Sequence, residues 1–129
     1  MPERRLSSAG RETLSRDERL RRRSEYRECY EKGRRQHGRF IVLHVLPNRH
    51  TGPRLGITLT RKVGGAVIRH RIRRRIREIY RRWEERRSLP AIDIVVHVRP
   101  PAREASFQEL RKELTRLLGR LLPAESRGR

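Results

Sequence analysis

The stretch "VIRHRIRRRIREIY", residues 67–80, constrains the fold of this chain more than any other segment. It combines six arginines in the nine positions from Arg69 to Arg77 with isoleucines spaced three or four residues apart. At about 100° per residue, the large apolar residues of 68–83 fall within one quadrant of a helix placed over 64–84. The predicted buried stripe consists of Ile68, Ile72, Ile76, Ile79 and Trp83. We therefore predict a helix that packs on the rest of the protein through this stripe.

The opposite face of the predicted helix is cationic. Exposed helix faces usually mix both signs of charge, but no acidic residue occurs from Arg69 to Arg77. Like charges at this density weaken an isolated helix, so the apolar stripe must hold it in place. The outer face carries His70, Arg73, Arg74, Arg77 and Arg81, with Arg69 at one border of the stripe and Arg71, Arg75 and Arg82 toward the other. The helix is predicted to bind a polyanion.

The charge of the whole chain supports nucleic acid as that polyanion. The formal net charge is +20, and only Lys32, Lys62 and Lys112 of the 35 basic residues are lysine. Arginine binds phosphate through a planar fork and stacks on bases. A GC-rich genome would favour arginine over lysine, but it would not explain the imbalance of sign. A strongly basic chain of this kind is expected to bind RNA or DNA.

The other periodic segments predict a small sheet between helices. A short helix is expected from a Ser24 N-cap to Gly33, with Tyr26, Cys29 and Tyr30 on one face. "GRFIVLHVLP" (38–47) alternates, with Phe40, Val42, His44 and Leu46 on one face, and it is apolar on both faces, as in a central strand. Residues 54–60 and 91–98 are predicted to be further strands. Ser106 and Glu109 form the capping box of a last, leucine-rich helix. We expect a single α+β domain, an α/β sandwich over one small sheet.

The ends of the chain and its single cysteine limit the remaining possibilities. Residues 1–20 are interpreted as a flexible basic arm, 21–122 as the folded domain and 123–129 as a disordered tail. Cys29 is the only cysteine, so no internal disulfide or cysteine-based zinc site is expected, and the residue suits a reducing cytoplasm. No apolar run reaches the length of a membrane span.

Catalytic residues are not apparent in the sequence. Acid–base or metal chemistry needs clustered carboxylates or histidines. Asp17 and Asp93 are the only aspartates and lie far apart in the sequence, and the five histidines lack the spacing of metal ligands. We therefore predict no catalytic and no metal-binding residue. Composition alone is equally compatible with a ribosomal protein or another architectural nucleic-acid-binding protein.

"RLGITLTRKVGGAVIRHRIRRRIREIYRR" (54–82) resembles the signature of the bacterial ribonuclease P protein component. In that family a strand leads through Lys-Val/Ile-Gly-Asn-Ala into a helix that opens with Arg-Asn-Arg. Three further stretches, "RRRSEYRECYEKGRR" (21–35), "GRFIVLHVLPN" (38–48) and "DIVVHVRPPA" (93–102), are similar to the family's first helix, next strand and last strand. The resemblance covers roughly residues 20–120. Two family asparagines are replaced, by Gly65 and His70.

The resemblance implies both a topology and a role. The expected element order is roughly α-β-β-β-α-β-α, with a left-handed βαβ crossover against the general preference, as in ribosomal S5 domain 2-like folds. The expected function is that of the protein subunit of ribonuclease P, which removes 5′ leaders from precursor tRNA. The RNA subunit would be the catalyst and would hold the Mg²⁺ ions, so this chain alone would cleave nothing. The alternative is a basic ribosomal or other structural RNA-binding protein without a role in tRNA processing.

The resemblance also implies two sets of RNA-binding residues. The catalytic RNA would be bound by Lys62, Arg69, His70, Arg71, Arg73, Arg74 and Arg77. The single-stranded leader of precursor tRNA would lie in a cleft formed by Arg22, Tyr26, Tyr30, Lys32, Phe40, Val42 and His44. No membrane is expected as a partner, and no protein partner is required. Because aromatic rings stack on bases of any sequence, Tyr26 and Tyr30 suit a variable leader.

Overall fold

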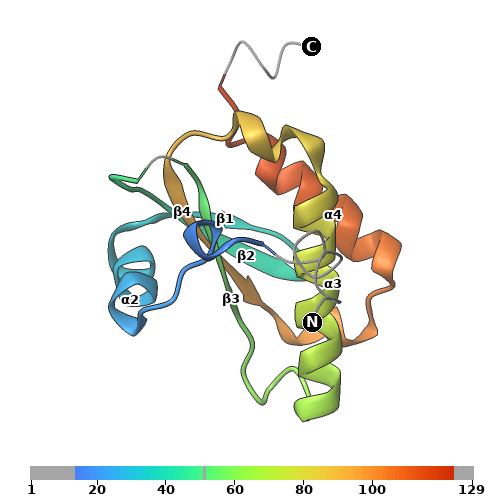
Figure 1. The fold of residues 1–129 in the computed structure, drawn as a ribbon. Helices are drawn as coiled ribbons and strands as arrows, with labels where there is room; N and C mark the ends of the chain where they lie inside the picture. Colours follow the sequence, from blue (N-terminus) through green and yellow to red (C-terminus); the bar gives the residue numbers. More distant parts are fainter. Residues whose placement is uncertain (1–13, 51, 124–129) are drawn as a thin grey trace, which may run out of the picture.

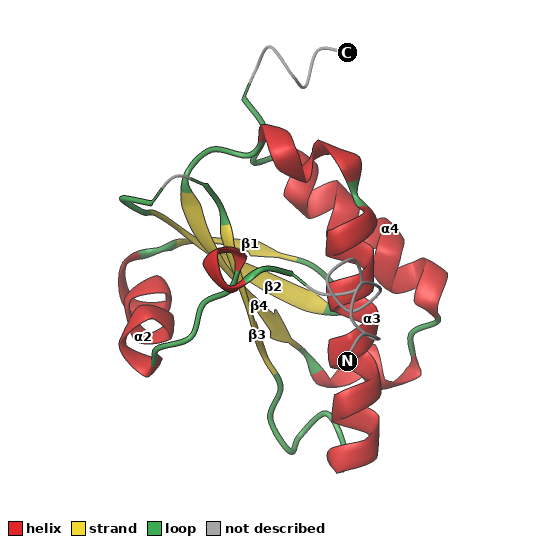
Figure 2. Cartoon of the chain, viewed as in Figure 1, coloured by secondary structure: helices red, strands yellow, loops and turns green. Residues whose placement is uncertain are grey.

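The computed structural model describes residues 14–50 and 52–123, and these form three layers (Figures 1 and 2). Helix α2 covers one face of a four-stranded sheet, and helices α3 and α4 cover the other. The elements in chain order are α2 (Arg23–Lys32), β1 (Arg34–His37), β2 (Ile41–Pro47), β3 (Arg54–Thr58), α3 (Ala66–Arg82), β4 (Ile92–Val98) and α4 (Phe107–Gly119), with short 3-10 turns η1 (Arg16–Glu18), η2 (Glu84–Ser88) and η3 (Pro100–Glu104). The predicted α+β class and element order are confirmed.

The strand order of the sheet is β1-β2-β4-β3. β2 pairs antiparallel with β1 and β4, whereas β3 and β4 are parallel neighbours connected through α3. This connection is a βαβ unit whose helix is the arginine-rich one. The sequence pattern did not reveal β1, because "RRQH" has no apolar alternation and its four residues are held by pairing with β2.

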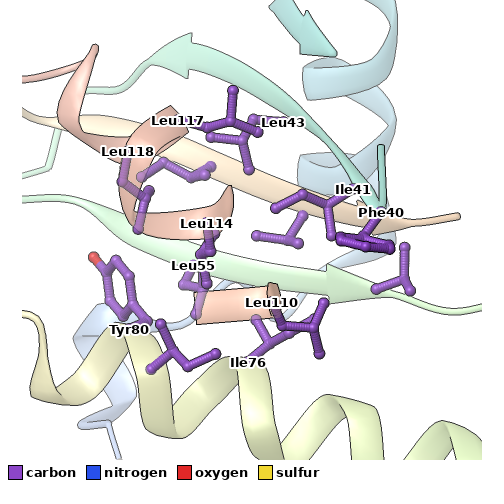
Figure 3. Close-up of a cluster of buried hydrophobic side chains, with 14 of the residues drawn as sticks. Phe40, Ile41, Leu43, Leu55, Ile76, Tyr80, Leu110, Leu114, Leu117 and Leu118 are labelled. Carbon is purple, nitrogen blue, oxygen red and sulfur yellow. The ribbon is translucent and has the colours of Figure 1, made fainter. Parts of the chain in front are cut away.

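The main core lies between the sheet and the pair α3–α4 (Figure 3). Ile72, Ile76 and Ile79 are buried there as the stripe predicted, while Ile68 and Trp83 are only partly buried. Tyr80, which was outside the predicted stripe, is 1% exposed and is the largest fully buried side chain described. It follows Ile76 by one helical turn on the border of the stripe. Because α4 packs beside α3, the buried arc of α3 is wider than contact with a sheet alone requires.

Helix α4 is fixed at its start and near its middle by carboxylates. Ser106 and Glu109 form the predicted capping box: the Glu109 N–H donates to Ser106 Oγ at 3.1 Å, and the Ser106 N–H donates to Glu109 Oε1 at 2.8 Å. Glu113 is buried and accepts three backbone N–H groups, from Arg39 (2.8 Å), Phe40 (2.8 Å) and Ile41 (2.9 Å). These charge-assisted bonds attach the start of β2 to α4.

The start of α2 differs from the prediction. Its N-cap residue is Arg22, not Ser24. A hydroxyl is not needed, because the Glu25 carboxylate reaches back and accepts the N–H groups of Arg21 at 3.2 Å and Arg22 at 3.0 Å. Glu25 thus fixes the start of the helix by accepting the two N–H groups that precede its first turn.

The predicted boundary between arm and domain at residue 20 is also wrong. Leu14 and Leu20 are both 5% exposed and belong to the two cores. Arg19 forms a parallel bridge with Leu55, and the Leu20 N–H donates to the Leu55 carbonyl at 2.9 Å. Residues 14–20 are therefore part of the folded unit and cover the free edge of β3. Residues 1–13 of the predicted arm and 124–129 of the predicted tail lie outside the described residues.

Candidate nucleic-acid interface

The strand register defines which sheet residues lie on the face beneath α2, and we call this surface the floor. One row of paired residues crosses all four strands as His37, Val42, His97 and Thr58. The next row is Arg35, His44, Val95 and Gly56, and a third contains Leu46, Asp93 and Arg54. Tyr26, Cys29 and Tyr30 of α2 contact the second and third rows. The first row lies at the end of the floor where Tyr30 reaches His97.

Tyr30 and two histidines form a ring cluster at this end. The ring centroids of Tyr30 and His44 are 4.5 Å apart with an interplanar angle of 62°, and those of Tyr30 and His97 are 5.9 Å apart at 84°. The Tyr30 hydroxyl lies 3.1 Å from His97 Nδ1. His44 is buried, and its Nδ1 has no hydrogen-bond partner among the described residues. His97 could not be recognised as a site residue from the sequence, because only the register of β4 against β2 places it near His44.

Burial controls the charge of this cluster. It lowers the pKa of His97, and together with the charges of His97, Arg35 and His37 it lowers the pKa of His44. Burial also raises the pKa of the Tyr30 phenol. Near neutral pH the two imidazoles are therefore uncharged, and the half-buried rings of Tyr30 and His97 are the members of the cluster that solvent reaches.

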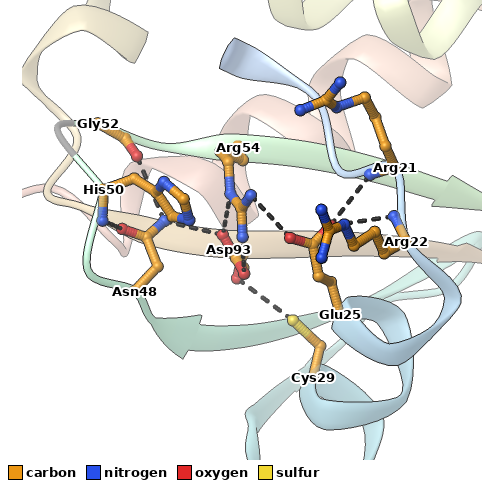
Figure 4. A network of polar contacts seen from close by, with 9 residues as sticks. All are labelled: Arg21, Arg22, Glu25, Cys29, Asn48, His50, Gly52, Arg54 and Asp93. Carbon is orange, nitrogen blue, oxygen red and sulfur yellow. Dashed lines mark hydrogen bonds and ion pairs between the residues drawn. The ribbon is translucent and has the colours of Figure 1, made fainter. Parts of the chain in front are cut away.

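A buried ion network fixes α2 over the sheet (Figure 4). The Arg54 guanidinium donates to both Asp93 oxygens, at 2.9 and 2.8 Å, and to Glu25 Oε2 of α2 at 2.9 Å. Asn48 Nδ2 donates to Asp93 Oδ1 at 2.8 Å. Hydrogen bonding to Asp93 raises the pKa of Arg54 against the effect of its burial. Burial alone would raise the pKa of Glu25, but the N–H groups of Arg22 and Arg21 and the Arg54 guanidinium outweigh it and lower this pKa.

Tyr26 occupies the other end of α2 and connects it with α3. Its ring lies directly on Gly56 of β3, where an added Cβ would come within 2.7 Å of a ring carbon. A hollow of about 240 Å³ beside it is lined by Tyr26, Arg19, Arg73 and Arg77 together with Leu14, Leu20 and residues 55–57 of β3. Burial, followed by the charges of Arg73 and Arg19, lowers the pKa of Arg77. Arg73 and Arg77, which were predicted to bind the catalytic RNA, thus lie at the edge of β3 together with Tyr26, which was predicted to bind the leader.

The six arginines from Arg69 to Arg77 of α3 are available for a ligand. Among the described residues, no ion pair or side-chain hydrogen bond is formed by any of the six arginines from Arg69 to Arg77. Glu78, the first acid after them, is engaged by Arg81 at 2.9 Å and by Arg82. The structure leaves Arg71, Arg74 and Arg77 exposed and Arg69, Arg73 and Arg75 half-buried.

The remaining predicted residues are spread more widely. Lys62 is exposed in the turn before α3, and His70 is exposed on its first two turns. Arg22 and Lys32 lie at opposite ends of α2, and Lys32 forms an exposed ion pair with Glu28 at 3.5 Å. Val42 is buried in the floor beside His97.

The prediction that Phe40 shares a strand face with His44 is wrong. Phe40 precedes β2, is buried, and packs in the main core on the α3–α4 side (Figure 3). Gly65 is the N-cap residue of α3, and an added Cβ would meet nothing within 4 Å. The family's asparagine would therefore fit at this position.

The described residues do not provide a metal site. No group of three or more His, Cys, Asp or Glu side chains in residues 14–50 and 52–123 is arranged to hold an ion. Burial raises the pKa of Cys29 to about 12, so its thiol stays protonated. No helix in the described part of the chain is long and apolar enough to span a bilayer.

Comparisons with known proteins agree with this architecture. The model of the Ribonuclease P family matches residues 14–122. The chain is 45% identical over 106 residues to the ribonuclease P protein component of Acidothermus cellulolyticus, which covers 80% of this chain and 87% of that protein. It is 42% identical over 120 residues to the component of Desulfovibrio desulfuricans, which covers 88% and 92%. The solved RNase P protein from Thermotoga maritima aligns with a TM-score of 0.72 at 32% identity, over 82% of this chain and 99% of that chain. The chain belongs to the ribonuclease P protein family and is a protein subunit of this tRNA-processing enzyme.

Proposed function

We propose that this subunit binds the catalytic RNA of ribonuclease P through α3 and the 5′ leader of precursor tRNA through the α2 side of the sheet. The observation that carries the proposal is the run from Arg69 to Arg77 of α3, whose six arginines form no ion pair among the described residues. Two of them, Arg73 and Arg77, reach Tyr26 on the α2 side of the sheet, which also carries a cluster of aromatic rings. Arginines bind the phosphates of folded RNA, whereas rings suit the unpaired bases of a single strand.

The leader is proposed to stack on Tyr30 and the neighbouring imidazoles. Tyr30 and His97 are half-buried and stand at a steep angle to each other, with the buried His44 beside Tyr30. Burial lowers the pKa of both histidines, which favours their neutral form. Such a surface accepts any base, because every base has a π-face. Arg35 and His37 on the adjacent edge strand supply positive or protonatable groups for the leader backbone.

Arg73 and Arg77 are proposed to hold the RNA strand where it passes from this floor to α3. They share a hollow with Arg19 and Tyr26, where burial first, and then the charges of Arg73 and Arg19, lower the pKa of Arg77. A bound phosphate would relieve the repulsion between these cations. In this proposal Arg73 and Arg77, which were predicted to bind only the catalytic RNA, bind RNA at the boundary between α3 and the α2 side of the sheet.

Catalysis is proposed to reside in the RNA. The described residues offer no donor set for Mg²⁺. The Mg²⁺ ions required for cleavage would be held by the RNA subunit, while the protein binds, orients and neutralises charge.

The test is reconstitution with the cognate catalytic RNA at low Mg²⁺. RNA-free protein should bind that RNA and cleave nothing, and the holoenzyme should release the leader from precursor tRNA. The logarithm of affinity should fall linearly with the logarithm of salt concentration, by about 0.7 to 0.9 per phosphate neutralised. Arg74→Gln should reduce this slope, whereas Arg87→Gln, an exposed arginine outside α3, should not. Cleavage by RNA-free protein would overturn RNA catalysis, and binding without stimulated cleavage would favour a purely structural RNA-binding role.

A further inference from the structure

A second hollow lies on the other side of α3, between this helix and the start of α4. Its volume is about 530 Å³, and it is lined by Val67, His70, Arg71, Arg74, Arg75 and Phe107, with Glu78 at one end. Five arginines of α3 are thus divided between two hollows. Arg73 and Arg77 line the hollow beside Tyr26, and Arg71, Arg74 and Arg75 line this one.

The hollow combines positive charge with apolar surface. Val67 is 79% exposed, although it is a large apolar residue. Phe107 is half-buried in the first turn of α4 and packs against the main core. A surface that bound only phosphates would need neither side chain. Val67 contributes little to the core, because most of its surface faces solvent.

We propose that this hollow binds an unpaired nucleobase of the catalytic RNA. The base would stack on Phe107 and contact Val67, and the phosphates on either side of it would pair with Arg71, Arg74 and Arg75. This inference rests on the proposed function, because it assumes that α3 meets the catalytic RNA.

The chemistry of the lining favours an extruded base over other occupants. Three arginines and a histidine surround the apolar residues, and the nearest acid, Glu78, is already engaged by Arg81 and Arg82. That charge is complementary to RNA. Proteins read folded RNA mainly through unpaired bases that stack on aromatic side chains, because the bases of a duplex are not accessible in this way. A volume of about 530 Å³ lies within the range of pockets that bind small molecules and cofactors.

Substitution of Val67 is the sharpest test, because this side chain is mostly exposed and its replacement can change RNA binding without changing stability. Val67→Ser should weaken the affinity of the protein for the catalytic RNA roughly 5- to 10-fold through lost apolar contact. Val67→Ile, which keeps the apolar surface and a similar helix propensity, should bind as the wild type does. Phe107→Leu should weaken binding about 5-fold or more, the value of one lost stacking contact. Thermal melts of the Val67 variants should match the wild type. If Phe107→Leu has a lower melting temperature than the wild type, the comparison of Val67→Ser with Val67→Ile alone tests the inference.

Salt dependence separates base contacts from phosphate contacts. Val67→Ser should lower affinity equally at all salt concentrations, whereas Arg74→Gln should also reduce the salt slope. Chemical probing of the catalytic RNA with dimethyl sulfate and a carbodiimide, which modify unpaired bases, should reveal one base protected by the wild type and Val67→Ile but not by Val67→Ser. Wild-type affinity and protection with Val67→Ser would overturn the inference. If Arg74→Gln also bound normally, the proposed role of α3 itself would fail.

Discussion

Replacement of Tyr30 tests the stacking floor most directly. In Tyr30→Ala the ring that lies 4.5 Å from His44 and 5.9 Å from His97 is removed. Loss of one stacking platform costs about 1–3 kcal/mol per base, which corresponds to a roughly 5- to 150-fold weaker Kd for precursor tRNA. Mature tRNA has no leader and should bind the variant holoenzyme as tightly as it binds the wild type.

Tyr30→Phe is the matched control for this change. It retains the ring and removes only the hydroxyl, which lies 3.1 Å from His97 Nδ1. One such hydrogen bond contributes about 0.5–1.5 kcal/mol to stability, so this variant should melt slightly lower while its affinity for precursor tRNA stays close to the wild-type value. The assay is the Kd of each holoenzyme for precursor and mature tRNA under conditions that prevent cleavage. Equal losses on both tRNAs with Tyr30→Ala would refute the stacking role and make Tyr30 a packing residue.

Three further predictions concern stability and are read by denaturant or thermal unfolding. Ile76→Ala should lower the free energy of unfolding by about 2–5 kcal/mol because Ile76 is 1% exposed, whereas Arg74→Ala should change it by less than about 0.5 kcal/mol; similar losses would show that the helix phase is wrong. Glu113→Gln should cost at least about 1.5 kcal/mol, because the neutral side chain replaces an acceptor of three N–H groups with one oxygen and an amide donor; a neutral change would contradict its role as a clamp. The pKa values of His44 and His97 are lowered in the folded state, so stability should be full above the usual histidine value of about 6.5 and fall as pH decreases below it; His97→Gln should make the melting temperature less dependent on pH between about 7.5 and 5.5.

The periodic elements could be predicted from the sequence because local pattern and burial agree in them. The isoleucine stripe of α3 and the Ser106–Glu109 capping box of α4 depend on residues three or four positions apart, and both are found in the structure. The segment 38–47, which is apolar on both faces, likewise predicted a central strand, and β2 (Ile41–Pro47) has neighbours on both sides. In each case the residues that predict the element are close together in the sequence, within a few turns of a helix or one strand.

The remaining features depend on partners that are distant in the sequence. β1 forms because β2 pairs with it, and Tyr80 is buried because α4 packs beside α3. Phe40 is drawn to the α3–α4 core where Glu113 holds the backbone at the start of β2. His97 joins the candidate site only through the register of β4. The division of the α3 arginines between two hollows required the positions of both α2 and α4.

The central position of β4 has a consequence for how the protein is made. β4 is the last strand in the chain, yet it lies between β2 and β3 and pairs with both. Until Ile92–Val98 has left the ribosome, the sheet lacks its middle strand, so neither the floor beneath α2 nor the apolar bed beneath α3 is complete. Pairing between residues so far apart in the sequence is intrinsically slow, because the loops between them must close first. A chain that is truncated before β4 would therefore present its arginines on an undocked segment, with general affinity for polyanions and without either shaped surface.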